Sequence, residues 1–435
     1  MADNNSMAAL QSTKFPTCSK CMNRGCGLKL NCIHSICLQC LQSLYIDDQF
    51  INCNLCQEDK GPKECISTEH SVLDACNVAD HVLINEEFVV KLTTKSHFRN
   101  TEYYEDLKIT CKVTLPSSDP VVEKYFSVKD HENGTCSLSG RCGVVGEWEL
   151  WCYVNDVKIR QSPLKVNVVK GGLEDNPHLF RERRNATAGM YMFDIVGDTI
   201  YACGGDNEIA KFTVKGKLVS TIYGPGSCHF TSLCCANVEG VLSIVCYDAS
   251  TKILMIYKKD NWHNWQDAKI ESVAGKMTSH DNRIYVPDFG KNCVLCFSIE
   301  GKLIEKIEDV HYKTVSLTKP IGVAITKKGD MLVLLFSNSQ VVQFDNDNRK
   351  PTILLKNTKD EQLLFKPLAI AIDERGQIII GSQKKLLLFS KEGKFIKHIE
   401  KIQQHLPEYP YCIFSKNRRV WVADKHDSSL RIYNY

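Results

Sequence analysis

The stretch Pro320–Leu335 reads PIGVAITKKGDMLVLL, and the stretch Pro367–Ser382 reads PLAIAIDERGQIIIGS. Both stretches begin with proline and have glycine at the tenth position, between two runs rich in Ile, Val and Leu. Two such runs joined by a glycine turn predict a pair of antiparallel strands. The two stretches start 47 residues apart, so one structural unit is repeated along the chain.

The same unit recurs six times within residues 176–435. Each copy has an apolar strand, a turn with Gly or Asp, a second apolar strand, a polar gap and a strand that ends in an aromatic residue. A period near 40–45 residues with about four strands is typical of propeller blades, so we expect a six-bladed β-propeller. A helical array is disfavoured because Val and Ile alternate with polar residues. The aromatic positions are Phe212, Tyr257, Phe297, Phe344, Phe389 and Tyr433, spaced 45, 40, 47, 45 and 44 residues apart.

The sixth unit ends with its aromatic strand, directly before Tyr435. Its blade therefore needs an outer strand from elsewhere in the chain. We expect a segment within residues 176–190 to supply this strand and to close the ring. The repeats resemble NHL repeats, and the matching stretches are Pro320–Ala324, Ile284–Asp288 and Phe389–Gly393.

Residues 86–169 alternate apolar and polar side chains in short runs separated by turn residues such as Asn133 and Gly134. This pattern predicts an antiparallel β-sandwich. The segment resembles a filamin-type immunoglobulin repeat through Gly146–Leu150 and Ser162–Leu164, which implies an interaction module or a structural spacer. Residues 58–85 are expected to form a short linker with a helix around Ser71–Ile84.

Residues 15–57 are dense in cysteine, with the spacing C-x2-C-x10-C-x1-H-x2-C-x2-C-x12-C-x2-C. Thiolates and an imidazole at such spacings are ligands that tetrahedral zinc selects. Two metal sites can also fold a segment that is too short to build its own core. We therefore expect two zinc ions, bound by Cys18, Cys21, Cys32, His34, Cys37, Cys40, Cys53 and Cys56.

The spacing resembles a RING finger of the C3HC4 type. The resemblance implies that Cys18, Cys21, Cys37 and Cys40 bind one ion, and that Cys32, His34, Cys53 and Cys56 bind the other. It also implies that the segment binds a ubiquitin-conjugating enzyme carrying ubiquitin and orients the thioester for reaction. The positions that match the enzyme-contacting surface are Lys20, Leu38, Leu55 and Gln57.

Three positions depart from the pattern of active RING fingers. Lys20 stands where Ile, Leu or Val is usual, and Asn54 stands where Pro is common. Gln57 stands where Arg or Lys often contacts ubiquitin. Two interpretations therefore stay open, an active ubiquitin ligase and a RING that serves only to dock a partner.

The order of a RING, a filamin repeat and NHL repeats is similar to that of the TRIM-NHL family of post-transcriptional regulators. A B-box and a coiled coil are not recognisable, since the spacings of Cys65, His70, Cys76 and His81 match no B-box. The resemblance implies an E3 ubiquitin ligase whose propeller recruits a protein substrate or RNA. The alternative is a non-catalytic scaffold that binds RNA or protein.

Single-stranded RNA or mRNA is a possible partner because residues 175–435 contain 36 Lys and Arg against 29 Asp and Glu. The sequence does not say whether the basic pairs share one face. The candidate RNA contacts are Arg183, Arg184, Lys327, Lys328, Lys384, Lys385, Arg418 and Arg419.

The chain contains 22 cysteines, most of them outside the zinc motif and without a compact disulfide pattern. Cys293 and Cys296 have the spacing of a zinc knuckle but lie within an expected strand, so we expect them in the core. The sequence shows no secretory signal and no run of 18 apolar residues. We therefore expect a cytoplasmic protein with free thiols and no membrane partner.

Zinc content tests the metal sites directly. The full chain should contain two zinc ions by elemental mass spectrometry, because the motif supplies two sets of four ligands. Cys37→Ser should reduce the count to one ion, whereas Cys26→Ser, outside the eight ligands, should leave it at two. A count of three would indicate that Cys65, His70, Cys76 and His81 form a further site.

Overall fold

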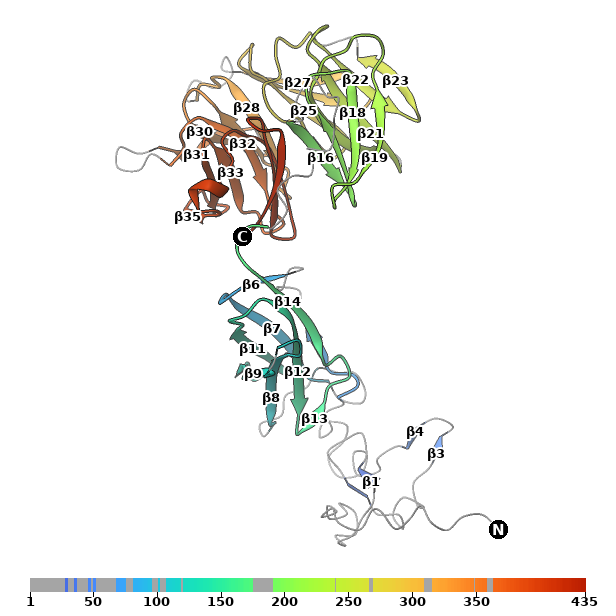
Figure 1. Cartoon of the computed structure of the whole chain (residues 1–435), viewed down its shortest axis with the longest axis vertical. Helices are drawn as coiled ribbons and strands as arrows, with labels where there is room; N and C mark the ends of the chain where they lie inside the picture. The colour runs from blue at the N-terminus through green and yellow to red at the C-terminus, as the bar shows by residue number, and fades with distance from the viewer. Residues whose placement is uncertain are drawn as a thin grey trace. The chain divides into compact units, whose positions relative to one another are not determined.

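The computed structural model describes residues 68–75, 81–95, 101, 107–118, 120–174, 191–238, 240–265, 269–308, 315–347, 349–357 and 363–435, with four short strands nearer the N-terminus. The chain divides into two compact units, Met1–Val169 and Lys170–Tyr435 (Figure 1). Regular structure in the described residues consists of strands and one short 3-10 turn at Gln403–His405, which confirms a mainly β chain. None of the described segments is a helix long and apolar enough to cross a membrane.

The described part of residues 15–57 consists of two short hairpins. Strand β1 (Leu28–Lys29) pairs with β2 (Ser35–Ile36), and β3 (Ile46–Asp47) pairs with β4 (Phe50–Ile51). The eight expected zinc ligands lie outside the described residues, as do Lys20, Leu38, Leu55 and Gln57. The zinc finger therefore stays a prediction from the sequence.

The first unit contains a two-sheet sandwich. Its core is built by alternation, because Phe88, Val90 and Leu92 on one strand point inward while the residues between them face solvent. Trp148 is completely buried, and its ring N–H donates to the carbonyl oxygen of Val144 at 2.9 Å. One sheet has the order β10 (Ser127–Asp130), β11 (Thr135–Arg141), β7 (Glu87–Thr93), β5 (Val72–Asp74). The other has the order β6 (Val82–Leu83), β14 (Leu164–Val169), β12 (Gly146–Val154), β8 (Ile109–Leu115), β9 (Val122–Tyr125), with β13 (Val157–Lys158) beside β12.

The helix expected around Ser71–Ile84 is wrong. Strand β5 pairs antiparallel with β7, and β6 pairs parallel with β14, so this segment supplies edge strands to both sheets. Leu73 and Val82 are buried, and edge pairing satisfies the backbone groups beside them. The sandwich therefore begins before residue 86.

The second unit is a six-bladed β-propeller, as the repeats predict, and each blade is a four-stranded antiparallel sheet. Blades 1 and 2 are β16 (Met192–Val196), β17 (Thr199–Cys203), β18 (Glu208–Thr213), β19 (Leu218–Tyr223) and β20 (Phe230–Val238), β21 (Val241–Asp248), β22 (Ile253–Lys258), β23 (Asn261–Trp265). Blades 3 and 4 are β24 (Thr278–His280), β25 (Arg283–Asp288), β26 (Cys293–Ser298), β27 (Leu303–Glu308) and β28 (Pro320–Ile325), β29 (Met331–Leu335), β30 (Gln340–Phe344), β31 (Pro351–Lys356). Blade 5 is β32 (Pro367–Ile372), β33 (Ile378–Ser382), β34 (Lys385–Phe389), β35 (Phe395–His398), and blade 6 contains β36 (Pro410–Lys416), β37 (Arg419–Asp424), β38 (Ser429–Asn434).

The six aromatic positions all fall on the third strand of their blades. Five of these side chains are buried, and Tyr257 is half-buried. Cys293 and Cys296 are fully buried on β26 and belong to core clusters on opposite faces of the blade, so their expected core position is confirmed.

The ring is closed by β15 (Gly172–Leu173), which pairs antiparallel with β38 and forms the outer strand of blade 6. Closure by an upstream segment is confirmed, but its expected place within residues 176–190 is wrong. The buried carboxylate of Glu400 accepts the backbone N–H of Leu173 at 2.9 Å. Gly172 has φ +89°, and a Cβ there would lie 2.7 Å from Glu400 Oε2, so only glycine fits.

Glu400 generates a test of the closure. Burial alone would raise the pKa of this carboxyl, but N–H groups of Ile402, Leu173 and Lys401, with His405 nearby, lower the pKa below its ordinary value of 4.5. Its contribution to stability is therefore present above that value and is lost as the pH falls through the lower pKa of the folded protein.

Glu400→Gln should lower the free energy of unfolding at neutral pH by ~1–3 kcal/mol, because the amide presents N–H groups to backbone donors. Thermal melts at several pH values should show that the difference in melting temperature between the variant and the parent protein becomes smaller as the pH is lowered. Glu392→Gln, at a carboxylate 57% exposed, is the matched control and should melt like the parent. Equal melting of all three proteins at neutral pH would contradict this role of Glu400.

Candidate functional site

The strand registers define two faces of the propeller. Pro320 pairs with Leu335, Pro367 with Ser382 and Pro410 with Asp424, so first strands begin where second strands end. We call this end of the blades the pocket face, and the other end the far face. The pocket face carries the loops between blades and the turns that follow the second strands.

Buried aspartates hold the loops of the pocket face in place. Asp248, Asp288 and Asp424 end the second strands of blades 2, 3 and 6, and each is completely buried. Asp288 accepts the N–H groups of Glu271 and Ser272 before blade 3, and of Gly290 and Lys291 after the strand, at 2.9–3.2 Å. One carboxylate therefore joins the loop before the blade to the turn within it.

Asp424 makes the same connection in blade 6. It accepts the N–H of Glu408 at 2.7 Å, of Tyr409 at 2.9 Å and of His426 at 3.0 Å. In Asp248, burial alone would raise the pKa of the carboxyl, but hydrogen bonds from His229, Thr251 and Ser250 lower it overall. These carboxylates are structural, because their oxygens are occupied by the protein itself.

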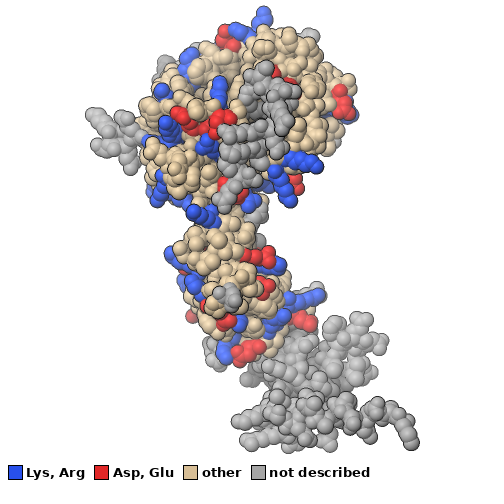
Figure 2. All heavy atoms as spheres, in the orientation of Figure 1, with Lys and Arg blue, Asp and Glu red and all other residues tan. Residues whose placement is uncertain are grey.

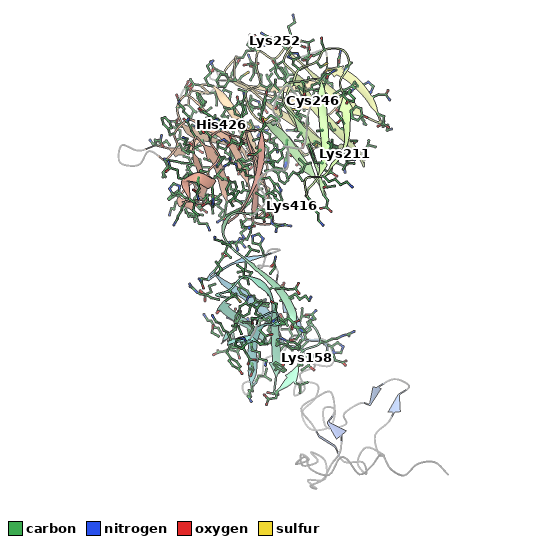
Figure 3. The ribbon with its side chains drawn as sticks, in the orientation of Figure 1. Lys158, Lys211, Cys246, Lys252, Lys416 and His426 are labelled. Atoms are coloured by element: carbon green, nitrogen blue, oxygen red, sulfur yellow. The ribbon has the colours of Figure 1, made fainter. Side chains whose placement is uncertain are left out.

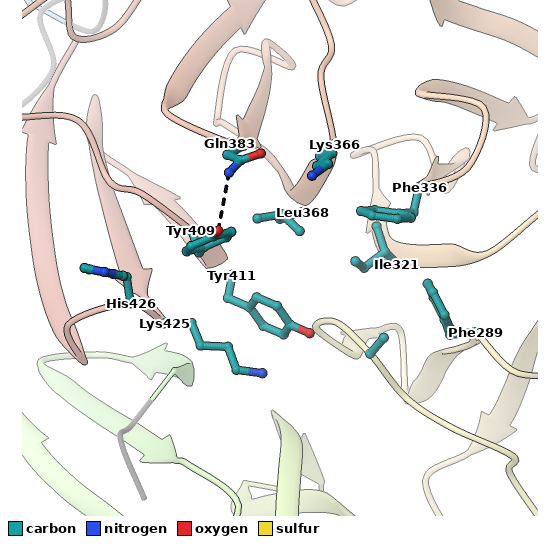
Figure 4. A pocket seen from close by; sticks show the side chains of 11 residues that line it. Phe289, Ile321, Phe336, Lys366, Leu368, Gln383, Tyr409, Tyr411, Lys425 and His426 are labelled. Atoms are coloured by element: carbon teal, nitrogen blue, oxygen red, sulfur yellow. Dashed lines mark hydrogen bonds between the residues drawn. The ribbon is translucent and has the colours of Figure 1, made fainter. Parts of the chain in front are cut away.

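A cavity of about 660 Å³ opens on the pocket face (Figure 4). Its lining has two unlike sides. The loops and strands of blades 3 and 4 supply apolar side chains, whereas those of blades 5 and 6 supply most of the polar ones. The apolar side contains Ala274, Phe289, Ile321 and Phe336, and the other side contains Lys366, Leu368, Gln383, Tyr409, Tyr411, Lys425 and His426.

Lys425 lies between two aromatic rings at this cavity. Its Nζ is 4.5 Å from the ring centre of Tyr191 and 4.4 Å from that of Tyr411. Partial burial lowers the pKa of this ammonium group. Lys366 Nζ lies 5.4 Å from the ring centre of Phe365, and Lys319 Nζ lies 4.7 Å from that of Phe289. Ring faces stabilise ammonium groups without neutralising their charge.

The rim beside Lys425 is hydrogen-bonded and paired. Gln383 Nε2 donates to Tyr409 Oη at 3.4 Å, and the rings of Tyr409 and His426 lie 6.3 Å apart (Figure 4). Glu408 pairs with Lys384 Nζ at 3.3 Å and lies 3.7 Å from His426 Nε2. The carboxylate at this rim is therefore already engaged by Lys384.

The central channel is lined by an ion pair whose side chains are 14% and 12% exposed. Lys276 Nζ donates to Asp194 Oδ1 at 2.8 Å and lies over the rings of Phe193 and Phe414. Burial alone would lower the pKa of Lys276, but Asp194 raises it overall. The other oxygen of Asp194 accepts the N–H of Cys235 at 2.9 Å. The pair connects blade 1 with the loop before blade 3 and leaves no unpaired charge at this point of the channel.

No group of three His, Cys, Asp or Glu side chains that could hold a metal occurs among the described residues. His70 and His81 lie in the described part, and His81 is completely buried, whereas Cys65 and Cys76 lie outside it. The zinc that the sequence predicts concerns the N-terminal motif alone.

The basic residues expected to contact RNA do not share one face. Lys384 and Lys385 lie on the pocket face next to Gln383, whereas the other described pairs occupy turns on the far face. In blade 6, Lys416 and His426 lie at opposite ends (Figure 3). Arg183 and Arg184 lie outside the described residues. The far-face pairs are Lys327 with Lys328 and Arg418 with Arg419.

Several of these basic groups are also engaged within the chain. Lys327 Nζ donates to the carbonyl oxygen of Glu374 at 2.5 Å, and Arg419 Nε lies 2.8 Å from Glu174 Oε1. Figure 2 shows Lys and Arg interspersed with Asp and Glu on the visible surface. RNA binding by these residues stays a prediction.

The sequence reasoning missed the pocket residues. Phe289, Phe336, Gln383 and His426 come from different blades, yet each lies one or two residues after the end of a second strand. An alignment of the repeats at the position after the second strand would have grouped these four residues as the candidate lining of a pocket.

No protein-family model matches the chain, and no curated protein matches it. Similar solved structures include virginiamycin B lyase from Staphylococcus aureus, with 13% identity, coverage of 76% of this chain and 100% of that chain, and a TM-score of 0.44. A putative gluconolactonase has 13% identity, coverage of 60% and 94%, and a TM-score of 0.45. A WD40 β-propeller domain has 15% identity, coverage of 66% and 86%, and a TM-score of 0.43.

The propeller assignment rests on the strand pairing of the chain itself. The fold and the cavity together are compatible with a propeller that binds a substrate or a partner protein.

Asp424→Asn tests whether the buried aspartate organises the pocket rim. The variant should lose ~1–3 kcal/mol of unfolding free energy, because an amide cannot accept all three N–H groups and leaves buried donors unsatisfied. Hydrogen exchange should speed up at the amides of Glu408, Tyr409 and His426. Asp198→Asn, at an exposed turn on the far face, is the control and should change neither quantity. Unchanged exchange in Asp424→Asn would contradict the assignment.

Proposed function

We propose that the chain is a RING-type E3 ubiquitin ligase whose propeller selects the protein substrate through the pocket-face cavity. The observation that carries the binding role is this cavity, which combines an apolar side with ammonium groups held over aromatic rings. The ligase role is supported by the spacing of the eight zinc-ligand positions in residues 15–57.

The proposed mechanism is proximity. Cys18, Cys21, Cys37 and Cys40 would hold one zinc ion, and Cys32, His34, Cys53 and Cys56 would hold the other. The ions would cross-link a segment that is too short to build a core. Leu38 and Leu55 would offer apolar contacts to a ubiquitin-conjugating enzyme, and the propeller would hold the substrate within reach, so that the transfer becomes effectively intramolecular.

A second candidate is a non-catalytic docking protein, and Lys20, Asn54 and Gln57 favour it. A lysine at position 20 places a charge where the conjugating enzyme usually meets an apolar side chain. Gln57 lacks the positive charge that would contact ubiquitin. In this alternative the propeller still binds its partner, and the RING serves only as an interaction surface.

Ubiquitin discharge by the full chain decides between the two candidates. With a panel of charged conjugating enzymes, the ligase should accelerate discharge with at least one of them, and Cys37→Ser should abolish the effect by removing a zinc ligand. Lys215→Met, at an exposed lysine in a far-face turn, is the control and should keep the parent rate.

Lys20→Ile provides the converse measurement. A rate similar to the parent supports an active native surface. The docking protein is the correct interpretation if only Lys20→Ile accelerates discharge. The same holds if the chain accelerates discharge from none of the conjugating enzymes.

A further inference from the structure

We propose that the pocket-face cavity binds an acidic segment of a partner protein, in which Asp or Glu side chains stand beside a bulky apolar residue. This inference rests on the proposed binding role of the propeller and names the chemical class of its ligand. The carboxylates would lie at Lys425 and Lys366, and the apolar side chain would lie against Phe289 and Phe336.

The charge of the cavity is the first argument. Within the described residues, Lys366 and Lys425 have no carboxylate within ion-pair distance, and their ammonium groups lie against rings instead. Lys319, beside Phe289, is held in the same way. Ring faces attract an ammonium group without neutralising its charge, so a ligand carboxylate gains an interaction that no group of the propeller already satisfies.

The nearby acids do not cancel this charge. Asp288 and Asp424 are completely buried, and their oxygens accept backbone N–H groups. Glu408 is engaged by Lys384 and lies near His426. The described lining of the cavity therefore carries a net positive charge.

The apolar side is the second argument. Phe289 and Phe336 lie 6.2 Å apart, and Ile321 and Ala274 complete this side of the lining. A volume of about 660 Å³ accommodates an aromatic or large aliphatic side chain together with neighbouring residues. Because the two sides are unlike, they fit an amphipathic ligand better than a uniformly charged one.

The lining also favours a peptide over RNA. Among the described residues that line the cavity there is no arginine, although arginine is the side chain best suited to phosphate. The rings of Tyr191 and Tyr411 are in contact with the ammonium group of Lys425, which occupies ring faces that a base would need for stacking. The remaining described basic pairs are divided between the two faces, so they form no path for a nucleic-acid backbone.

The positions of the cations favour side-chain carboxylates over a single chain terminus. Lys366 precedes blade 5 and Lys425 follows the second strand of blade 6, so the two charges come from different blades. Two separated cations match a segment with more than one acidic residue.

Fluorescence anisotropy with the full chain tests the proposal. The probe is a labelled 12-residue Gly-Ser peptide with an amidated C-terminus and a central Glu-Glu-Phe sequence. Matched probes contain Gln-Gln-Phe or Glu-Glu-Ala. We expect the first probe to bind at least tenfold more tightly than either of the others, and its affinity to fall with added salt.

Variants locate the binding site. Lys425→Met and Lys366→Met should each weaken the Glu-Glu-Phe probe at least tenfold while barely changing the weak Gln-Gln-Phe binding. Lys215→Met should bind like the parent. Thermal melting of each variant shows whether it is folded, and Lys366→Met keeps the test valid if Lys425→Met does not fold, since Lys366 is exposed.

Several outcomes would overturn the proposal. They are equal affinity for the Glu and Gln probes, no binding of any probe at millimolar concentration, tighter binding of a free-terminus Gln-Gln-Phe peptide, and tighter binding of single-stranded oligouridine. Ubiquitin discharge uses no ligand of the cavity, so it can fail while acidic-peptide binding holds, and the reverse is also possible.

Discussion

Ring closure is the constraint on which the rest of the propeller depends. Five blades carry four strands from one continuous stretch each, but blade 6 takes its outer strand from Gly172–Leu173, at the other end of the unit. Two residues of strand are a small interface, and they are reinforced by Glu400, which accepts the N–H of Leu173, and by Glu174, whose carboxylate pairs with Arg419. These contacts of residues 172–174, which we call the closing contacts, thus connect the start of the unit with blade 6 and with the loop after blade 5.

The cavity inherits its shape from this closure. Its polar side is built from blades 5 and 6, and the closing contacts join these blades to β15. The two tyrosine rings around Lys425 come from opposite ends of the ring of blades. Tyr191 precedes blade 1, Tyr411 lies in the first strand of blade 6, and Lys425 lies between them. A propeller that opened at this point would separate the two tyrosines and lose the aromatic site of Lys425. The aromatic site of Lys425 therefore depends on the contact between blades 1 and 6.

The sequence predicted the repeated architecture well because the repeats share one physical requirement. Each third strand carries an aromatic residue that is buried in five blades and half-buried in blade 2, and this requirement leaves a period that can be read without a structure. The closing strand was misplaced because two residues, one of them glycine, carry no periodicity. The helix expected around Ser71–Ile84 failed for a similar reason, since strands of two and three residues at sheet edges are defined by their partners and not by their own pattern.

The candidate site was harder to predict because its residues are far apart in the sequence. The eight zinc-ligand positions are close in the sequence, so their spacing alone suggests a metal. The cavity instead collects residues from the loops and strands of four blades, each in a stretch with an ordinary local sequence. The basic pairs are prominent in the sequence as possible RNA contacts. In the structure, however, Lys384 pairs with Glu408, and Arg419 pairs with Glu174. Lys425 and Lys366, isolated in the sequence, have ring faces as partners, and a cation without a carboxylate partner is the one that a ligand can neutralise.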